Sequence, residues 1–84
     1  MTEKLPVIKG KQLIKLLEKD GWLESGGKGS HIALRKEYSD RTRITVIKNT
    51  NDSIPAGTLS AILGSKQTQL GKAGLLVLIK KYGI

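Results

Sequence analysis

Cysteine is absent from this sequence of 84 residues, and histidine occurs once, as His31. A disulfide framework and a thiolate zinc site are therefore excluded, and one imidazole cannot supply the usual zinc-binding spacings. The seven acidic residues show no clustered ligand pattern, and a chain this short has little room for a deep cofactor pocket. We therefore expect neither a metal nor a cofactor, and the missing cysteines favour a reducing, cytoplasmic compartment.

Long apolar runs are missing as well. The longest is GLLVLI near the C-terminus, which is far below the roughly 20 residues that a membrane-spanning helix needs. Glu3 and Pro6 interrupt the stretch in which a secretory signal would place its apolar segment. The sequence thus predicts a single domain over residues 1–84, with no membrane contact and no export.

Acidic residues are scarce relative to basic ones. Fifteen Lys and Arg against seven Asp and Glu give a net charge of +8 and a pI near 10.0. Such a field on a small surface favours polyanionic partners, and nucleic acid is the first candidate. An acidic protein partner fits the same field.

Hydrophobic periodicity predicts the order helix, three strands, helix, helix. This is an α+β fold with helices layered on one face of a three-stranded antiparallel sheet. The helices are expected over residues 9–20, 54–63 and 71–82, and the strands over residues 22–25, 30–36 and 41–47. The residues expected in the core are Leu13, Leu16, Leu17, Trp22, Ile32, Ile44, Leu59 and Ile62.

The second and third strands are expected to form a hairpin in which Ile32 lies opposite Ile44. Side chains alternate between the two faces of a strand, so the face covered by helices would carry Ser30, Ile32, Leu34, Thr42, Ile44 and Val46. The other face would carry His31, Ala33, Arg35, Arg41, Arg43 and Thr45. Because a histidine and three arginines cannot all be buried unpaired, we expect His31 to face water or a ligand.

His31 ends a glycine-rich stretch, GGKGSH, over residues 26–31. This is not a nucleotide-binding P-loop, because Gly29 follows Lys28 and Trp22 stands where the motif needs its first glycine. A turn of this kind can still hold a phosphate oxygen through its backbone N–H groups, with Lys28 adding positive charge.

An imidazole beside a bound phosphate has the chemistry needed to cleave RNA without a metal. Imidazole accepts or donates a proton near neutral pH, the RNA 2′-hydroxyl attacks the adjacent phosphorus, and cations stabilise the extra negative charge. DNA lacks this internal nucleophile, so such a site points to RNA. Alternatively, His31 is a solvated polar residue at the start of a strand, which is the commoner role of a lone histidine.

Four segments occur together in this chain: GKQLIKLLEKDGW at 10–22, KGSH at 28–31, RITV at 43–46 and IPAGTLSAIL at 54–63. In this order they resemble the HicA toxin family, also called the YcfA-type mRNA interferases, over residues 8–64. The resemblance implies a fold like that of double-stranded-RNA-binding domains, with helix, three-stranded sheet and helix. Residues 65–84 extend past the usual end of that family as a C-terminal helical extension, which would serve as an added core helix, a partner surface or a regulatory tail. It also implies that His31 is the catalytic residue of a ribosome-independent mRNA cleavage, and that a HicB antitoxin covers the active face.

Many members of that family carry a second histidine in the loop after the third strand. This chain has TVIKN at residues 45–49 instead, so a scheme with two histidines is not available. The other proton or the charge would come from Lys28, Lys48, an arginine of the exposed sheet face, or water.

We therefore expect the toxin of a type II toxin-antitoxin pair, a metal-independent endoribonuclease that cleaves mRNA through His31 and is neutralised by a HicB-like antitoxin. The residues expected to bind RNA are Lys28, Gly29, Ser30, Arg35, Arg41 and Arg43. Two alternatives stay open. One is a non-catalytic RNA-binding module with the same fold, and the other is a DNA-binding assembly to which this chain contributes only an interaction surface.

Overall fold

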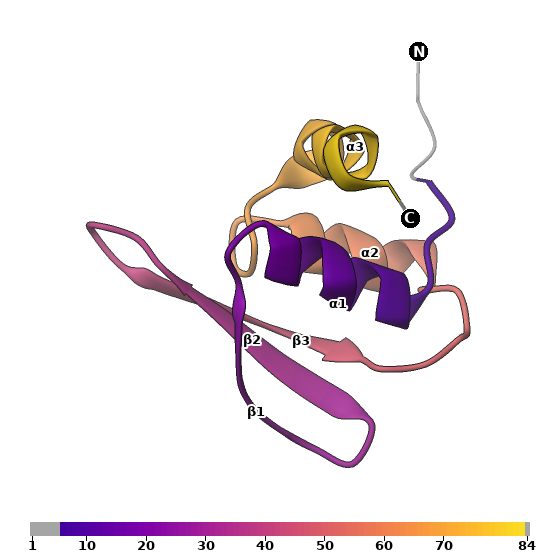
Figure 1. Ribbon diagram of the computed structural model, residues 1–84, viewed down its shortest axis with the longest axis horizontal. Helices are drawn as coiled ribbons and strands as arrows, with labels where there is room; N and C mark the ends of the chain where they lie inside the picture. Colours follow the sequence, from indigo (N-terminus) through magenta and orange to yellow (C-terminus); the bar gives the residue numbers. More distant parts are fainter. Residues whose placement is uncertain (1–5, 84) are drawn as a thin grey trace.

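The computed structural model describes residues 6–83, so residues 1–5 and 84 of the expected domain lie outside the described residues. The elements are α1 (Gly10–Lys19), β1 (Leu23–Lys28), β2 (His31–Glu37), β3 (Thr42–Lys48), α2 (Ala56–Leu63) and α3 (Gly71–Tyr82). The strands form one antiparallel sheet in the order β1-β2-β3, and the three helices lie on the same side of it (Figure 1). The α+β fold and the additional C-terminal helix expected from the sequence are confirmed.

Helix α1 forms because its apolar residues recur on one side. The buried ones are Leu13, Ile14, Leu16 and Leu17. At its start, the Gln12 side chain accepts a hydrogen bond from the Lys9 N–H at 2.9 Å. The helix stops at Gly21, whose φ of 101° suits a left-handed stop, and the following residue, Trp22, folds back under it. Trp22 is 1% exposed, so its expected place in the core is confirmed.

One hydrophobic core links the sheet to the helices. Helices α1 and α2 pack against β3, whereas α3 packs against α1 and α2 on the side away from the sheet (Figure 1). Of the other residues expected in the core, Leu13, Leu16, Leu17, Leu59 and Ile62 are buried, and Ile32 packs against the core partly buried. No described residue covers the opposite face of the sheet, which we call the open face.

The register between β2 and β3 differs from the expected one. Ile32 lies opposite Ile47 and not opposite Ile44. The connection between the strands is a loop from Tyr38 to Arg41, closed by a 2.7 Å hydrogen bond from the Tyr38 N–H to the carbonyl oxygen of Arg41. Because the shift of three residues is an odd number, β3 presents the opposite set of side chains to the helices.

This register places apolar side chains on the open face. Ile44 and Val46 are 54% and 49% exposed, so the expectations that Ile44 belongs to the core and that both residues face the helices are wrong. Thr42 also lies on the open face. The β3 residues found on the covered face are Arg43, Thr45 and Ile47. Thr45 is tolerated there because its hydroxyl donates a 2.6 Å hydrogen bond to the Gln67 side-chain oxygen.

The register predicts that replacing two isoleucines of β3 by alanine lowers the stability of the protein by different amounts. Ile47→Ala removes a side chain that is 1% exposed, and we expect the free energy of unfolding to fall by about 3 kcal/mol. Ile44→Ala removes one that is 54% exposed, and we expect a loss below about 1 kcal/mol. Urea unfolding followed by circular dichroism measures both values. Equal losses, or a larger loss for Ile44→Ala, would contradict the register.

Candidate functional site

Three side chains of the open face lie in one row across the sheet. His31 begins β2, where it pairs with Lys28 of β1 on one side and with Lys48 of β3 on the other. Directly opposed residues of antiparallel strands project to the same face with Cβ atoms about 5 Å apart. The imidazole therefore stands between two side chains that each carry an ammonium group. We call Lys28, His31 and Lys48 the basic row.

The polar groups of the basic row are not used by the fold. All three side chains are exposed. Within residues 6–83, neither lysine forms an ion pair and the imidazole makes no hydrogen bond. The expectation that His31 faces solvent is confirmed, and one proton-exchanging group and two cations are available to a ligand on this face.

The hairpin between β1 and β2 is tighter than the glycine-rich turn expected from the sequence. Residues 26–28 belong to β1, and only Gly29 and Ser30 form the turn. Gly29 has a φ of 64°, the positive value that a type II′ turn needs at its first position. Ser30 is exposed in this turn and does not lie on the covered face, and its carbonyl oxygen accepts a 2.6 Å hydrogen bond from the Asn49 N–H. This bond ties the end of β3 to the turn beside the basic row.

Gly27 lets β1 approach β2 closely at this point. A methyl group on Gly27 would collide with the carbonyl oxygen of His31, and the φ of 152° also disfavours a side chain. Glycine is therefore required at position 27 for a structural reason: it permits the strand pairing that places Lys28 beside His31.

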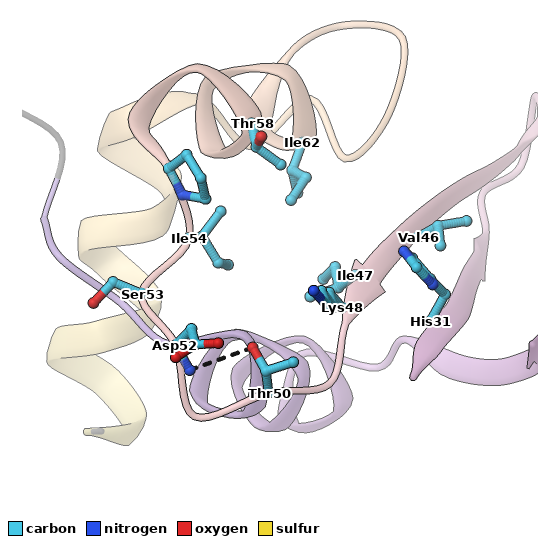
Figure 2. A pocket seen from close by; sticks show the side chains of 11 residues that line it. His31, Val46, Ile47, Lys48, Thr50, Asp52, Ser53, Ile54, Thr58 and Ile62 are labelled. Atoms are coloured by element: carbon cyan, nitrogen blue, oxygen red, sulfur yellow. Dashed lines mark hydrogen bonds between the residues drawn. The ribbon is translucent and has the colours of Figure 1, made fainter. Parts of the chain in front are cut away.

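A pocket of about 410 Å³ opens next to the basic row, between the end of β3, the loop after it and α2. His31 and Lys48 belong to its lining, so the row and the pocket are continuous. Its apolar walls include Val46, Ile47, Ile54 and Ile62, and its polar groups include Thr50, Asp52 and Thr58. Figure 2 shows His31, Val46 and Lys48 on the sheet side, with Thr58 and Ile62 facing them from α2.

Backbone hydrogen bonds hold the loop after β3 against the start of α1. The carbonyl oxygen of Asp52 accepts a bond from the Gly10 N–H at 3.3 Å, and the Ile54 N–H donates to the carbonyl oxygen of Ile8 at 2.8 Å. A methyl group on Gly10 would collide with the carbonyl oxygen of Lys48. The N-terminal segment thus fixes the side of the pocket that carries Asp52.

Two of the arginines expected to bind RNA lie away from His31. Arg35 is on the open face, but four residues along β2 from His31, or about 13 Å, and it pairs with Glu37 at 3.3 Å. Arg41 lies in the loop between β2 and β3, where it pairs with Asp40 at 3.4 Å. Neither guanidinium therefore adjoins the basic row.

Arg43 lies on the covered face of the sheet, and the expectation that it shares the open face with His31 is wrong. Its guanidinium donates hydrogen bonds to the carbonyl oxygens of Ser65 and Gln67 at 2.7 and 3.3 Å. The cause is the register of β3, which turns this side chain toward the connection between α2 and α3. Arg43 stabilises that connection and does not reach a ligand on the open face.

From the sequence, Lys48 is only one of several possible partners for His31, and nothing there distinguishes Thr50, Asp52 or Thr58 as site residues. The correct register would have identified Lys48, because pairing fixes which residue of β3 lies opposite the first residue of β2. Nothing in the local sequence marks the pocket, since packing of α2 against β3 creates it.

Among the described residues, neither a cluster of metal-ligating side chains nor a membrane-spanning helix is found. Within residues 6–83, no three histidine, cysteine or acidic side chains come together as a metal site. Three of the acidic groups there pair with basic neighbours instead: Asp20 with Lys36, Glu37 with Arg35 and Asp40 with Arg41. No helix in this part of the chain is long and apolar enough to cross a bilayer.

Comparison with known proteins gives a match at the level of the family. The family model described as HicA toxin of bacterial toxin-antitoxin matches residues 10–70, from the start of α1 to the residue before α3. Comparison with curated proteins gives no match, and comparison with solved structures gives none either. The matched span covers most of the chain and includes the whole basic row and the pocket. The protein therefore belongs to the HicA toxin family of bacterial toxin-antitoxin systems.

Proposed function

We propose that this toxin is an endoribonuclease that cleaves mRNA in the cytoplasm, with His31 as its proton-transferring group, and that a HicB-like antitoxin neutralises it. The observation that carries the proposal is the basic row, in which an unpaired imidazole lies between two unpaired lysines among the described residues. Family membership supports a toxin, and the basic row supports a specific reaction for it.

An RNA phosphodiester laid across the basic row meets the groups that transesterification requires. Lys28 and Lys48 contact the non-bridging oxygens and stabilise the negative charge that grows on them. His31 accepts the proton of the 2′-hydroxyl, whose oxygen bonds to phosphorus while the bond to the 5′-oxygen breaks. The leaving 5′-oxygen takes a proton from a flanking ammonium group or from water. The products are a 2′,3′-cyclic phosphate and a 5′-hydroxyl, and no step calls for a metal.

The open face also favours a protein partner. Leu23, Ile44 and Val46 are 64%, 54% and 49% exposed, and they share this face with His31. Lys48 is the next residue after Val46 on the same face of β3. A partner that buries these apolar side chains would therefore also cover the basic row, and the net charge of +8 favours an acidic one. We propose that the antitoxin inhibits the toxin by occupying the open face.

Expression in a bacterial host tests the toxin and its inhibition together. We expect the chain expressed alone to arrest growth and to deplete mRNA, and co-expression with its HicB-like partner to restore both. A His31→Ala chain, expressed to the same level, serves as the matched control and should leave growth unaffected. Accumulation of folded wild-type protein with normal growth and intact mRNA would contradict the proposal.

A further inference from the structure

The pocket beside the basic row has the features of a site for an RNA base. It is continuous with His31 and Lys48, so a nucleotide whose phosphate lies on the basic row has its base within reach of the pocket. Its volume of about 410 Å³ and its largely apolar walls, which include Val46, Ile54 and Ile62, suit a flat aromatic ring. Single-stranded RNA is commonly read in this way, with bases unstacked and placed against protein side chains.

Asp52 is the acidic residue of this lining, and its negative charge is opposite in sign to the charges of the two lysines in the basic row. A carboxylate repels the phosphates that Lys28 and Lys48 attract, so it does not serve to hold the RNA backbone. Within residues 6–83, Asp52 forms no ion pair, unlike Asp20 and Asp40. A carboxylate in a phosphate-binding site is instead suited to accept hydrogen bonds from the edge of a base.

The loop holds Asp52 in place without using its side chain. The Asp52 N–H donates to the Thr50 hydroxyl oxygen at 3.3 Å, as Figure 2 shows, and its carbonyl oxygen accepts from the Gly10 N–H at 3.3 Å. Both bonds use backbone atoms of Asp52, so the two carboxylate oxygens stay available. The backbone at Asp52 is thus held by the fold, while its side chain is exposed to a ligand.

We infer that the pocket selects guanine in the nucleotide adjoining the scissile phosphate, with Asp52 as the specificity-determining residue. Guanine is the RNA base that presents two neighbouring donors, its N1–H and its N2 amino group, and these match the two oxygens of one carboxylate. Adenine, cytosine and uracil each offer a carboxylate one donor group on this edge. The inference rests on the proposed function, since it assumes that RNA occupies the basic row.

Binding of the four 3′-mononucleotides to the full chain tests the selectivity. We expect 3′-GMP to shift the amide resonances of residues 50–58 and to bind at least about fivefold more tightly than 3′-AMP, 3′-CMP or 3′-UMP. Asp52→Asn should remove this preference, whereas Asp40→Asn, which changes an exposed carboxylate in the distant loop between β2 and β3, should keep it. Equal binding of the four nucleotides, shifts elsewhere in the protein, or an unchanged preference in Asp52→Asn would overturn the inference.

Mapping of the cut sites separates this inference from the proposed function. We expect wild-type cuts to adjoin guanine and those of Asp52→Asn to lose that bias. If wild type cleaves RNA without a guanine bias, or if Asp52→Asn keeps the bias, the selectivity is wrong while the ribonuclease stands. If 3′-GMP binds selectively in the pocket while RNA is not cleaved, the selectivity stands and the ribonuclease is wrong.

Discussion

His31→Ala is expected to lower the rate of RNA cleavage by about a thousandfold. The imidazole is the group of the basic row that accepts the 2′-hydroxyl proton in the proposed reaction, and the two flanking residues are lysines. Removing it leaves the two ammonium groups in place, so RNA affinity should stay within about threefold of the wild-type value. Because His31 is exposed, the loss should occur without a change in the fold. Cleavage of a labelled RNA under single-turnover conditions measures the rate, and a binding titration measures the affinity.

Thr42→Ala is a suitable control for this variant. Thr42 lies on the same open face at the opposite end of the hairpin, six residues along β3 from Lys48, or about 20 Å from the basic row. Its replacement should leave the cleavage rate within about twofold of wild type. If His31→Ala cleaved as fast as Thr42→Ala, the proton would be transferred by another group. If His31→Ala lost RNA binding to the same extent as cleavage, His31 would be a contact and not the proton-transferring group.

Local signals in the sequence are enough to predict most of the fold. Helical periodicity predicts the apolar stripe of α1. A chain reversal within a few residues accounts for the helix end at Gly21 and for the burial of Trp22. The same holds for α3, whose bounds agree with the expected 71–82. Such features depend on neighbours in the chain, which the sequence displays directly.

The register of β3 could not be predicted in this way, because both of its faces carry apolar side chains. Ile44 and Val46 alternate with Thr45 and Ile47, so hydrophobic pattern alone does not say which pair faces the helices. Two other features determine which face of β3 packs against the helices. The loop between the strands sets the pairing, and the distant residue Gln67 accepts a hydrogen bond from the Thr45 hydroxyl. Both depend on geometry that a local pattern does not contain.

The same distinction applies to the candidate site: the position of one residue follows from the local sequence, and the rest depends on the register or on the tertiary structure. The place of His31 on the open face follows from β2 alone, because Leu34 has to face the core and side chains alternate. Lys48 enters the site through the register, and Arg43 leaves it for the same reason. The pocket needs the full tertiary structure, since Asp52 and the α2 residues reach the basic row only when α2 packs beside β3.

A single 2′-deoxy substitution in the RNA is expected to have an effect as large as that of His31→Ala. The proposed reaction uses the 2′-oxygen as its nucleophile, so removing this atom at a mapped cut site should abolish cleavage there. Phosphate charge and base identity are unchanged, so binding should be preserved. Cuts at other positions of the same oligonucleotide provide an internal control.

The most direct measurement is therefore cleavage of two RNA oligonucleotides by the purified protein in the presence of EDTA, one unmodified and one 2′-deoxy at a mapped cut. We expect the unmodified RNA to yield a 2′,3′-cyclic phosphate and a 5′-hydroxyl, and the modified linkage to stay intact. Cleavage of the 2′-deoxy linkage at an undiminished rate, or products that end in a 5′-phosphate, would contradict it.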